Sequence, residues 1–236
     1  MPASSDPVPR GEPIAMYLRD LLLAGSPSTR LYLVRHAQSL GNRGEYDGPD
    51  DDPPLSEVGR EQTRRLAQRF RSQRLDAIYS SPMRRTLETA EAIAAVTGLE
   101  IRIMDDLREV DVGQANESYD AYSDKQVRAL AEKVARDRKW DSFPGSEGSV
   151  EVRNRISGAI NRVIEQCPEQ RVAVVCHAAV IMTYVSHILG LEPDFVFYPF
   201  NSGITSVRAL GERRVIWRLN DIAHLDGMPA GFGGIS

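Results

Sequence analysis

The sequence contains few cysteines and no long apolar run. Its two cysteines among 236 residues, Cys167 and Cys176, do not form a CxxC motif. This excludes a disulfide framework and a cysteine-rich zinc site, and it fits a reducing cytoplasm. The apolar stretch from Leu21 to Ala24 is far shorter than the ~20 residues that a membrane-spanning helix needs. We therefore expect a cytoplasmic protein without a targeting or membrane-spanning segment.

A large excess of charge of one sign is also missing. The 29 lysines and arginines nearly balance the 33 aspartates and glutamates, which gives a formal net charge of -4. The sequence therefore gives no reason to expect nucleic acid or an anionic membrane as a partner. Hydrophobic residues make up 42% of the chain and charged residues 26%, the balance of a soluble globular protein. Any site for an anion must be local.

The composition divides the chain into three parts. Residues 1–29 are rich in proline and serine around one short helical stretch, Ile14 to Ala24, and are interpreted as an N-terminal extension. Residues 30–222 form the predicted folded domain, in which no internal repeat occurs. The glycine-rich end indicates a flexible C-terminal tail over residues 223–236. A homodimer contact through Leu21 to Leu23 is one hypothesis for the extension.

Predicted strands alternate with predicted helices along the folded domain. Strands are expected at residues 31–35, 77–79, 100–104 and 172–176, and a hairpin at 205–210 and 214–219. Helices are expected from residue 57, over 83–94, around 125–135, over 152–163 and over 178–189. The first of these has Ser56 as its N-cap, and Gly98 ends the second. This alternation predicts an α/β fold: a three-layer sandwich with a mostly parallel central sheet and helices on both faces.

The faces of three helices follow from their apolar periodicity. The helix from residue 57 is predicted to present Val58, Gln62, Leu66 and Phe70 on one face; the next presents Met83, Leu87, Ala90 and Ala94; and the later helix presents Val152, Ile156, Ala159 and Val163. The stretch 172–176 is apolar throughout, as expected for a parallel strand that helices cover on both faces. It is predicted to lie at the centre of the sheet.

Residues suited to phosphate chemistry follow the predicted strands. His36 and His177 stand directly after the strands 31–35 and 172–176, and ligands of open α/β sheets bind at the carboxyl edge where such strands end. The helix that begins at Ala178 would direct free amides into the same pocket. Arg35 precedes His36, and Arg84 and Arg85 follow the turn at another strand end. Guanidinium groups match phosphate oxygens in a bidentate manner.

Several motifs in order resemble those of the histidine phosphatase superfamily, which has the phosphoglycerate mutase-like fold. They are the Arg-His box at residues 35–42, the Leu-Ser segment at 55–62, the second arginine box at 80–90, Leu107-Arg108-Glu109, the second histidine box at 174–179 and the turn at 201–204. The resemblance covers about residues 31 to 220. Each motif is weak by itself, but the whole set in this order is specific.

The resemblance implies a metal-independent phosphatase that needs no cofactor. His36 would attack phosphorus and form a phosphohistidine, and Glu109 would act as general acid and then as general base. Arg35, Arg84 and His177 would hold the phosphate oxygens. The resemblance also suggests three residues for substrate binding: Ser39, Asn42 and Ala178. For Ser39 and Asn42 a role as turn formers is an equal alternative.

Two other functions remain open on the sequence. A phosphoglycerate mutase uses the same residues, but the 68 positions between Glu109 and His177 (177 minus 109) leave little room for the longer insertion of mutases. A non-catalytic phospho-ligand binding module would not need both His36 and Glu109. We expect a small phosphorylated substrate, with phosphoprotein side chains as an alternative, and a lid within residues 113–149.

Overall fold

The computed structural model of the chain describes residues 14–48, 52–113 and 123–228. The strands are β1 (Thr29–Arg35), β2 (Ala77–Ser80), β3 (Ile101–Ile103), β4 (Arg171–Cys176), β5 (Ile204–Leu210) and β6 (Arg213–Asp221). The helices are α1 (Ile14–Leu21), α2 (Glu57–Arg71), α3 (Arg84–Thr97), α4 (Asp124–Asp137), α5 (Ser149–Gln166) and α6 (Ala178–Ile188). Short 3-10 turns occur at η1 (Gly41–Arg43), η2 (Asp105–Leu107), η5 (Trp140–Ser142) and η6 (Ala223–Leu225). In these described ranges no helix has the length and apolar character needed to cross a membrane.

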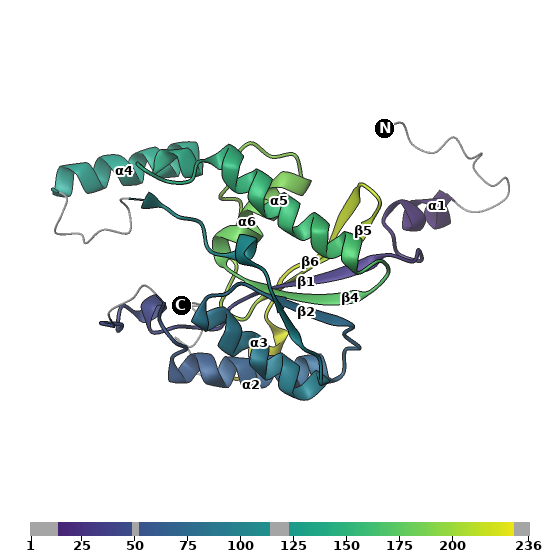
Figure 1. Cartoon of the computed structure of the whole chain (residues 1–236). Helices are drawn as coiled ribbons and strands as arrows, with labels where there is room; N and C mark the ends of the chain where they lie inside the picture. Colours follow the sequence, from purple (N-terminus) through teal and green to yellow (C-terminus); the bar gives the residue numbers. More distant parts are fainter. Residues whose placement is uncertain (1–13, 49–51, 114–122, 229–236) are drawn as a thin grey trace.

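The six strands form one sheet in the order β3-β2-β4-β1-β5-β6. The strands β3, β2, β4 and β1 are mutually parallel. Strand β5 is antiparallel to β1, and β6 is antiparallel to β5, with which it forms the predicted hairpin. Helices α2 and α3 cover one face, and α5 and α6 cover the other (Figure 1). The predicted three-layer α/β sandwich with a mostly parallel sheet is thus confirmed, with β4 and β1 at its centre.

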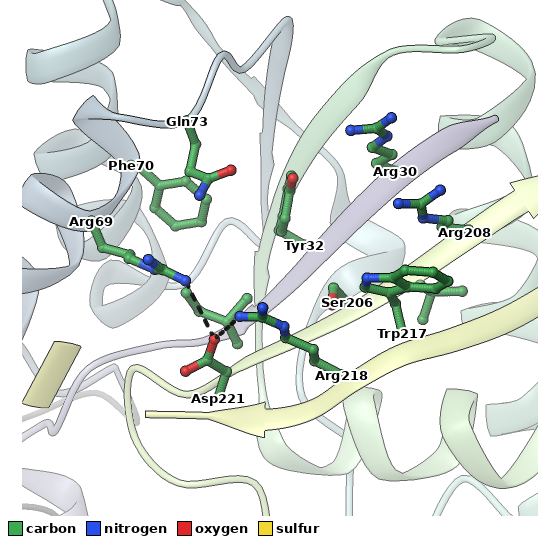
Figure 2. A pocket seen from close by; sticks show the side chains of 12 residues that line it. Arg30, Tyr32, Arg69, Phe70, Gln73, Ser206, Arg208, Trp217, Arg218 and Asp221 are labelled. Atoms are coloured by element: carbon green, nitrogen blue, oxygen red, sulfur yellow. Dashed lines mark hydrogen bonds and ion pairs between the residues drawn. The ribbon is translucent and has the colours of Figure 1, made fainter. Parts of the chain in front are cut away.

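The α2 side of the sheet is only partly covered. Helix α2 packs beside the start of β1, where the Phe70 and Tyr32 rings meet edge to face at 5.8 Å between centroids. Beyond Tyr32, the face formed by β1, β5 and β6 lines a cavity of about 220 Å³ (Figure 2). This cavity lies apart from the carboxyl ends of the parallel strands.

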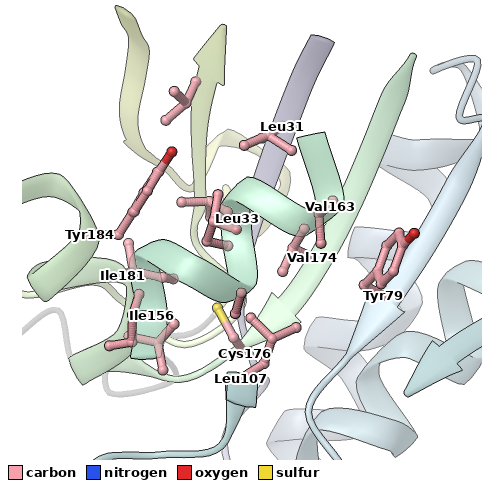
Figure 3. Packing of buried hydrophobic residues seen from close by; sticks show 14 of the residues in the cluster. Leu31, Leu33, Tyr79, Leu107, Ile156, Val163, Val174, Cys176, Ile181 and Tyr184 are labelled. Carbon is pink, nitrogen blue, oxygen red and sulfur yellow. The ribbon is translucent and has the colours of Figure 1, made fainter. Parts of the chain in front are cut away.

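Strand β4 is apolar throughout because its two faces meet two separate cores. Val172, Val174 and Cys176 belong to the cluster under α5 and α6 (Figure 3). Ala173 and Val175 belong to the cluster under α2 and α3. A strand covered on both sides loses the polar alternation of a half-exposed strand. The predicted apolar face of α5 is confirmed as well, since its four residues Val152, Ile156, Ala159 and Val163 are fully buried.

Helix α2 begins where the sequence predicts and is tied to the loop after β1. The Ser56 hydroxyl accepts a hydrogen bond from the Gly59 amide at 3.0 Å, as an N-cap should. The Ser56 amide donates to the Gln38 carbonyl at 2.9 Å. A Cβ atom on Gly59 would lie 2.0 Å from that same carbonyl oxygen, so only glycine allows this approach. Of the predicted face, Gln62, Leu66 and Phe70 are buried.

The predicted face of α3 is wrong, although the helix and its end at Gly98 are as expected. The buried residues are Thr86, Thr89, Ala90 and Ile93, so the two sets share only Ala90. Threonine side chains can be buried here because their hydroxyls donate to backbone carbonyls: Thr86 to Ser81 at 2.9 Å and Thr89 to Arg85 at 2.7 Å. A prediction from the periodicity of apolar residues alone misses buried polar side chains of this kind, whose hydroxyl groups are hydrogen-bonded.

Both chain ends have ordered parts that contact the hairpin or α2. Helix α1 ends at Leu21, three residues before the predicted limit, and Leu23 is fully buried. The Arg208 guanidinium donates to the Leu23 carbonyl at 2.6 Å. At the other end, η6 packs against α2, and His224 Nε2 lies 2.8 Å from the Ser202 hydroxyl. The predicted tail therefore begins with a packed segment; residues 1–13 and 229–236 lie outside the described ones.

The core under α5 permits a test of the packing. Ile156→Ala removes a fully buried side chain and should lower the free energy of unfolding by about 2–5 kcal/mol through lost burial and the cavity left behind. Val150 on the same helix is 64% exposed, so Val150→Ala should change the free energy of unfolding by less than about 0.5 kcal/mol. Urea denaturation of both variants measures the difference; equal losses would contradict the described packing.

Candidate active site

The two predicted catalytic histidines lie side by side at the carboxyl edge of the sheet. Strands β1 and β4 are paired in parallel with Arg35 opposite Cys176, so the next residue of each strand, His36 and His177, leaves the sheet at the same point. Their ring centroids are 5.2 Å apart. The prediction that two strand ends bring these histidines into one pocket therefore agrees with the geometry.

His36 is held as a neutral imidazole with one free nitrogen. Its side chain is buried, and Nδ1 lies 2.8 Å from the Ala37 carbonyl oxygen. A carbonyl can only accept, so Nδ1 carries the proton and Nε2 keeps its lone pair. Burial lowers the pKa of His36 well below its usual range, and the charges of Arg35 and Arg85 lower it further. A neutral ring with an available Nε2 is what a nucleophile requires.

His177 is completely buried at the N-cap of α6. Its Nε2 lies 2.9 Å from the Ser81 hydroxyl, whereas its Nδ1 has no hydrogen-bond partner among the described residues. Burial, followed by the charges of His36, Arg85 and Arg35, lowers the pKa of His177 well below its usual range. A buried polar nitrogen without a partner is costly, and an oxygen of a bound phosphate would satisfy it.

Arg35 brings a buried guanidinium to the same place. Its side chain is 5% exposed, Nη1 donates to the Pro199 carbonyl at 2.7 Å, and the guanidinium lies 5.1 Å from the centroid of the Tyr198 ring. Its Nε atom has no hydrogen-bond partner in the described part of the chain. Arg35 and His177 thus each present an unpaired buried donor position near His36, which favours an anionic ligand.

The second arginine of the site is Arg85, which corrects the prediction of Arg84. The Arg84 side chain is 58% exposed and its Nε donates to Glu88 at 2.9 Å. The Arg85 side chain is only 12% exposed, and its charge acts on the pKa of His36, His177 and Glu109. The reason is the orientation of α3, which directs Arg85 inward and Arg84 to the surface.

Glu109 is a carboxyl group whose environment favours the protonated form. It follows η2, is partly buried, and accepts a hydrogen bond from the Val110 amide at 3.1 Å. Burial raises the pKa of Glu109 above its usual range, while the Val110 amide, Arg35, Arg85 and the Ala179 amide oppose that rise. Glu109 thus combines a raised pKa with positive neighbours, as a general acid should.

The first turn of α6 reaches this carboxyl group. The backbone amide of Ala179 lowers the pKa of Glu109, whereas Ala178, the predicted substrate-binding residue, is the partly exposed first residue of the helix. Free amides at a helix N-terminus favour negative charge. The amide described at Glu109 is therefore that of Ala179, and the role predicted for the Ala178 amide stays a prediction.

A partly buried ion pair that the sequence did not reveal holds the segment of Glu109. Arg155 on α5 forms a bidentate pair with Glu147, with both distances 2.9 Å. Arg155 Nη1 also donates to the carbonyls of Asp106 and Arg108 at 2.8 and 3.0 Å. Glu147 accepts from the Asp111 amide at 2.9 Å. These bonds hold the backbone on both sides of Glu109. No residue spacing in the sequence predicts them.

Ser39 and Asn42 form a closed turn after His36. The Ser39 amide donates to Asn42 Oδ1 at 3.1 Å, and the Asn42 amide donates to the Ser39 hydroxyl at 3.2 Å. Asn201 Nδ2 donates both to Asn42 Oδ1 and to the His36 carbonyl, each at 3.1 Å. These contacts correspond to the alternative in which Ser39 and Asn42 shape the loop, and they show how Asn201 orients it.

The assembled site therefore contains two neutral imidazoles, two guanidinium groups and one carboxyl group of raised pKa. Across residues 14–48, 52–113 and 123–228 no group of three or more histidine, cysteine, aspartate or glutamate side chains is arranged to hold a metal ion. The arrangement suits in-line attack on a phosphate, with positive charge around its equatorial oxygens.

Comparison with known proteins identifies the family. Residues 31–222 match the model of the histidine phosphatase superfamily, branch 1. The chain belongs to this superfamily. This chain is 36% identical over 206 residues to phosphoserine phosphatase 1 of Hydrogenobacter thermophilus, and the match covers 83% of this chain and 94% of the relative. These matches support the function that the resemblance implied: the chain is a phosphatase.

Two further matches illustrate the range of the family. A Cronobacter sakazakii protein named probable phosphoglycerate mutase GpmB is 30% identical over 162 residues, covering 69% of the histidine phosphatase and 75% of that relative. The solved structure of Bacillus stearothermophilus YhfR aligns with a TM-score of 0.73 at 24% identity, covering 84% of this chain and 100% of that one. The second match supports the fold.

The two neighbouring arginines of α3 provide a matched pair of variants. Arg85→Gln should lower kcat/KM for p-nitrophenyl phosphate about 10²-fold, because it removes positive charge that stabilises the transition state. Arg84→Gln makes the same change of charge one residue away, at an exposed pair with Glu88, and should lower kcat/KM less than about threefold. Steady-state kinetics of both variants decides; the reverse ranking would restore Arg84 to the site.

The ion pair of Arg155 gives a second test, of positioning. We expect Arg155→Met to lower kcat about tenfold or more with little change in KM, because Glu109 would no longer be held at the leaving oxygen. It should also shift the limb of the pH profile that reports Glu109. Arg162→Gln on the same helix removes an exposed partner of Asp106 and serves as the control. Equal effects of the two substitutions on kcat would exclude a positioning role.

Proposed function

We propose that this phosphatase hydrolyses a small phosphomonoester, with phosphoserine as the substrate class, through a phosphohistidine on Nε2 of His36. The observation that supports the proposal most directly is the fixed tautomer of His36. Its Nδ1 proton is bound by the Ala37 carbonyl at 2.8 Å, and burial keeps the pKa of the ring well below its usual range. Nε2 therefore retains its lone pair for attack on phosphorus.

In the first step, the Nε2 lone pair of His36 forms a bond to phosphorus while the bond from phosphorus to the ester oxygen breaks. Glu109 transfers its proton to the departing oxygen, which leaves as an alcohol. The raised pKa of Glu109 supports this role, because a protonated carboxyl is needed at the start. Arg35, Arg85 and His177 hold the equatorial oxygens as the charge on them redistributes.

In the second step, water replaces the histidine. The ionised Glu109 accepts a proton from the water molecule, whose oxygen forms the new bond to phosphorus, and the bond from phosphorus to nitrogen breaks. The electron pair of that bond returns to Nε2, inorganic phosphate leaves, and Glu109 ends protonated as it began. The same arginines serve both steps, so positive charge need not be rearranged between them.

The proposed substrate class rests on the relatives. Phosphoserine phosphatase 1 of H. thermophilus shares 36% of its aligned residues with this chain. The segment 113–149, predicted as a lid, includes α4, which has no buried residue and extends away from the sheet (Figure 1). Residues 114–122 of that segment lie outside the described ones. We assign substrate discrimination to the described part of this segment, residues 123–149.

A mutase activity is the second candidate, because a relative named probable phosphoglycerate mutase is 30% identical to the chain. A mutase must return the phosphoryl group to substrate instead of to water. The short span from Glu109 to His177 contains α4, η5, α5 and β4, and Arg155 of α5 anchors the Glu109 segment. Incubation with 3-phosphoglycerate separates the two: a phosphatase releases inorganic phosphate, whereas a mutase forms 2-phosphoglycerate.

The experiment that tests the proposal measures phosphate release from phosphoserine in the presence of EDTA. His36→Ala should lower kcat more than about 10⁴-fold, as loss of a nucleophile does, and the wild-type chain should form an acid-labile phosphoenzyme that the variant lacks. His187→Ala changes a histidine in the last turn of α6, outside the site, and should keep full activity. Comparable turnover in His36→Ala would refute the nucleophile.

The pH dependence of the same assay follows from the pKa shifts. Because the pKa of Glu109 is raised, its protonated form persists above the usual range and is lost as the pH rises through the raised pKa. Because the pKa of His36 is lowered, the ring stays neutral as the pH falls until that lowered pKa is reached. We expect kcat/KM to be highest on the acid side of neutrality and to decline as the pH rises, a decline that Glu109→Gln should abolish.

A further inference from the structure

A cavity that none of the catalytic residues lines has the composition of an anion site. It lies between α2 and the hairpin of β5 and β6, on the open part of the α2 face, and has a volume of about 220 Å³ (Figure 2). Four arginines line it, Arg30, Arg69, Arg208 and Arg218, together with a single acidic residue, Asp221. The cavity therefore holds far more positive than negative charge.

The one acid is already paired at one end of the cavity. Asp221 lies 3.0 Å from Arg218 and 3.6 Å from Arg69. At the other end, Arg208 donates to the Leu23 carbonyl at 2.6 Å, which does not neutralise its charge. The Arg30 guanidinium has neither a hydrogen bond nor an ion pair within the described part of the chain. Two guanidinium groups are thus left without an acid on the same side of the cavity.

These two charges are close enough to disfavour each other. The pKa of Arg208 is lowered, first by burial and then by the charge of Arg30, while Tyr32 opposes the shift. Figure 2 shows both guanidinium groups beside each other at the cavity rim, with the Tyr32 hydroxyl facing the same space. Neighbouring guanidinium groups bind a carboxylate or phosphate through paired hydrogen bonds, which would remove the repulsion.

An aromatic surface lies directly beside this pair. The Arg208 guanidinium is 4.0 Å from the centroid of the Trp217 ring, and Trp217 is 43% exposed. Tyr32 also lines the cavity, and its ring meets Phe70 edge to face. We propose that the cavity binds a small organic anion with a flat ring, its carboxylate or phosphate between Arg30 and Arg208 and its ring against Trp217 and Tyr32.

The volume limits the ligand. About 220 Å³ is below the roughly 300–1,000 Å³ of pockets for drug-sized ligands, so the ligand carries one or two rings. The site is separate from the catalytic one: Arg30 and Tyr32 lie in the first half of β1, whereas His36 follows its end. The cavity also touches Ile204 and Asp221, close to the turn at 201–203 that bonds to Arg35 and His36.

Tryptophan fluorescence can test this proposal without any assay of turnover. The chain has two tryptophans; Trp140 is 5% exposed in the core, whereas Trp217 lines the cavity. Titration with phenylphosphonate, a ring-bearing anion that cannot be hydrolysed, should give a saturable change in emission that is absent in Trp217→Phe. Inorganic phosphate, which has no ring, should bind at least about tenfold more weakly.

Matched arginine variants give the decisive comparison. Arg30→Gln should weaken phenylphosphonate binding about tenfold, through loss of one charge-assisted contact. Arg128→Gln, an exposed change on α4 with the same loss of charge, should leave the affinity unchanged. Arg85→Gln should also leave the Trp217 signal in place, since it affects the catalytic site. No saturable signal, equal weakening by Arg30→Gln and Arg128→Gln, or loss of the signal in Arg85→Gln would each overturn the proposal.

Discussion

The guanidinium of Arg35 is buried beside two imidazoles, and after burial itself its charge is one of the influences on the pKa of both histidines and of Glu109. The protein holds it with the Pro199 carbonyl and the Tyr198 ring instead of with a carboxylate. Its charge therefore remains uncompensated nearby and lowers the pKa of both His36 and His177. The same charge opposes the rise that burial causes in the pKa of Glu109. One buried cation thus helps to make the nucleophile neutral and limits how strongly the acid holds its proton.

Backbone groups position the residues around that charge. The turn at 201–203 bonds to the backbone of both Arg35 and His36: the Arg35 amide donates to the Gly203 carbonyl at 3.2 Å, and the Ser202 amide donates to the carbonyls of both residues. Asn201 adds a side-chain bond to the His36 carbonyl. On the other side, Arg155 fixes the chain around Glu109. Nucleophile and acid come from segments far apart in sequence, so each needs its own anchor.

The sequence predicts the strands and the histidines well because their signals are local. An apolar run followed by histidine places His36 and His177 at strand ends, and parallel pairing of β1 and β4 brings them together. Arg155 and Glu147 could not be predicted in the same way. Their bonds reach backbone carbonyls and amides that lie 36 to 49 residues away in the sequence. Nothing in the local pattern distinguishes them from surface charges.

The predicted face of α3 and the choice of Arg84 differ from the structure in the same direction, although the face was predicted from apolar periodicity and Arg84 from the resemblance to the family. Each residue turns an α-helix by about 100°, and the face predicted from Met83, Leu87, Ala90 and Ala94 differs from the buried face by roughly one such step. That rotation exchanges the positions of Arg84 and Arg85 relative to the sheet. The buried threonines Thr86 and Thr89 explain why apolar periodicity gave the wrong rotation.

Asp52 connects the start of α3 to the Arg85 side chain. Its two carboxylate oxygens accept the Arg84 backbone amide at 2.8 and 2.9 Å at the start of α3, while its distance to the Arg85 guanidinium is 3.7 Å. The carboxylate therefore stabilises the N-terminus of α3, one residue before Arg85. Because the same carboxylate lies beside the Arg85 guanidinium, one side chain connects the start of the helix to the position of Arg85.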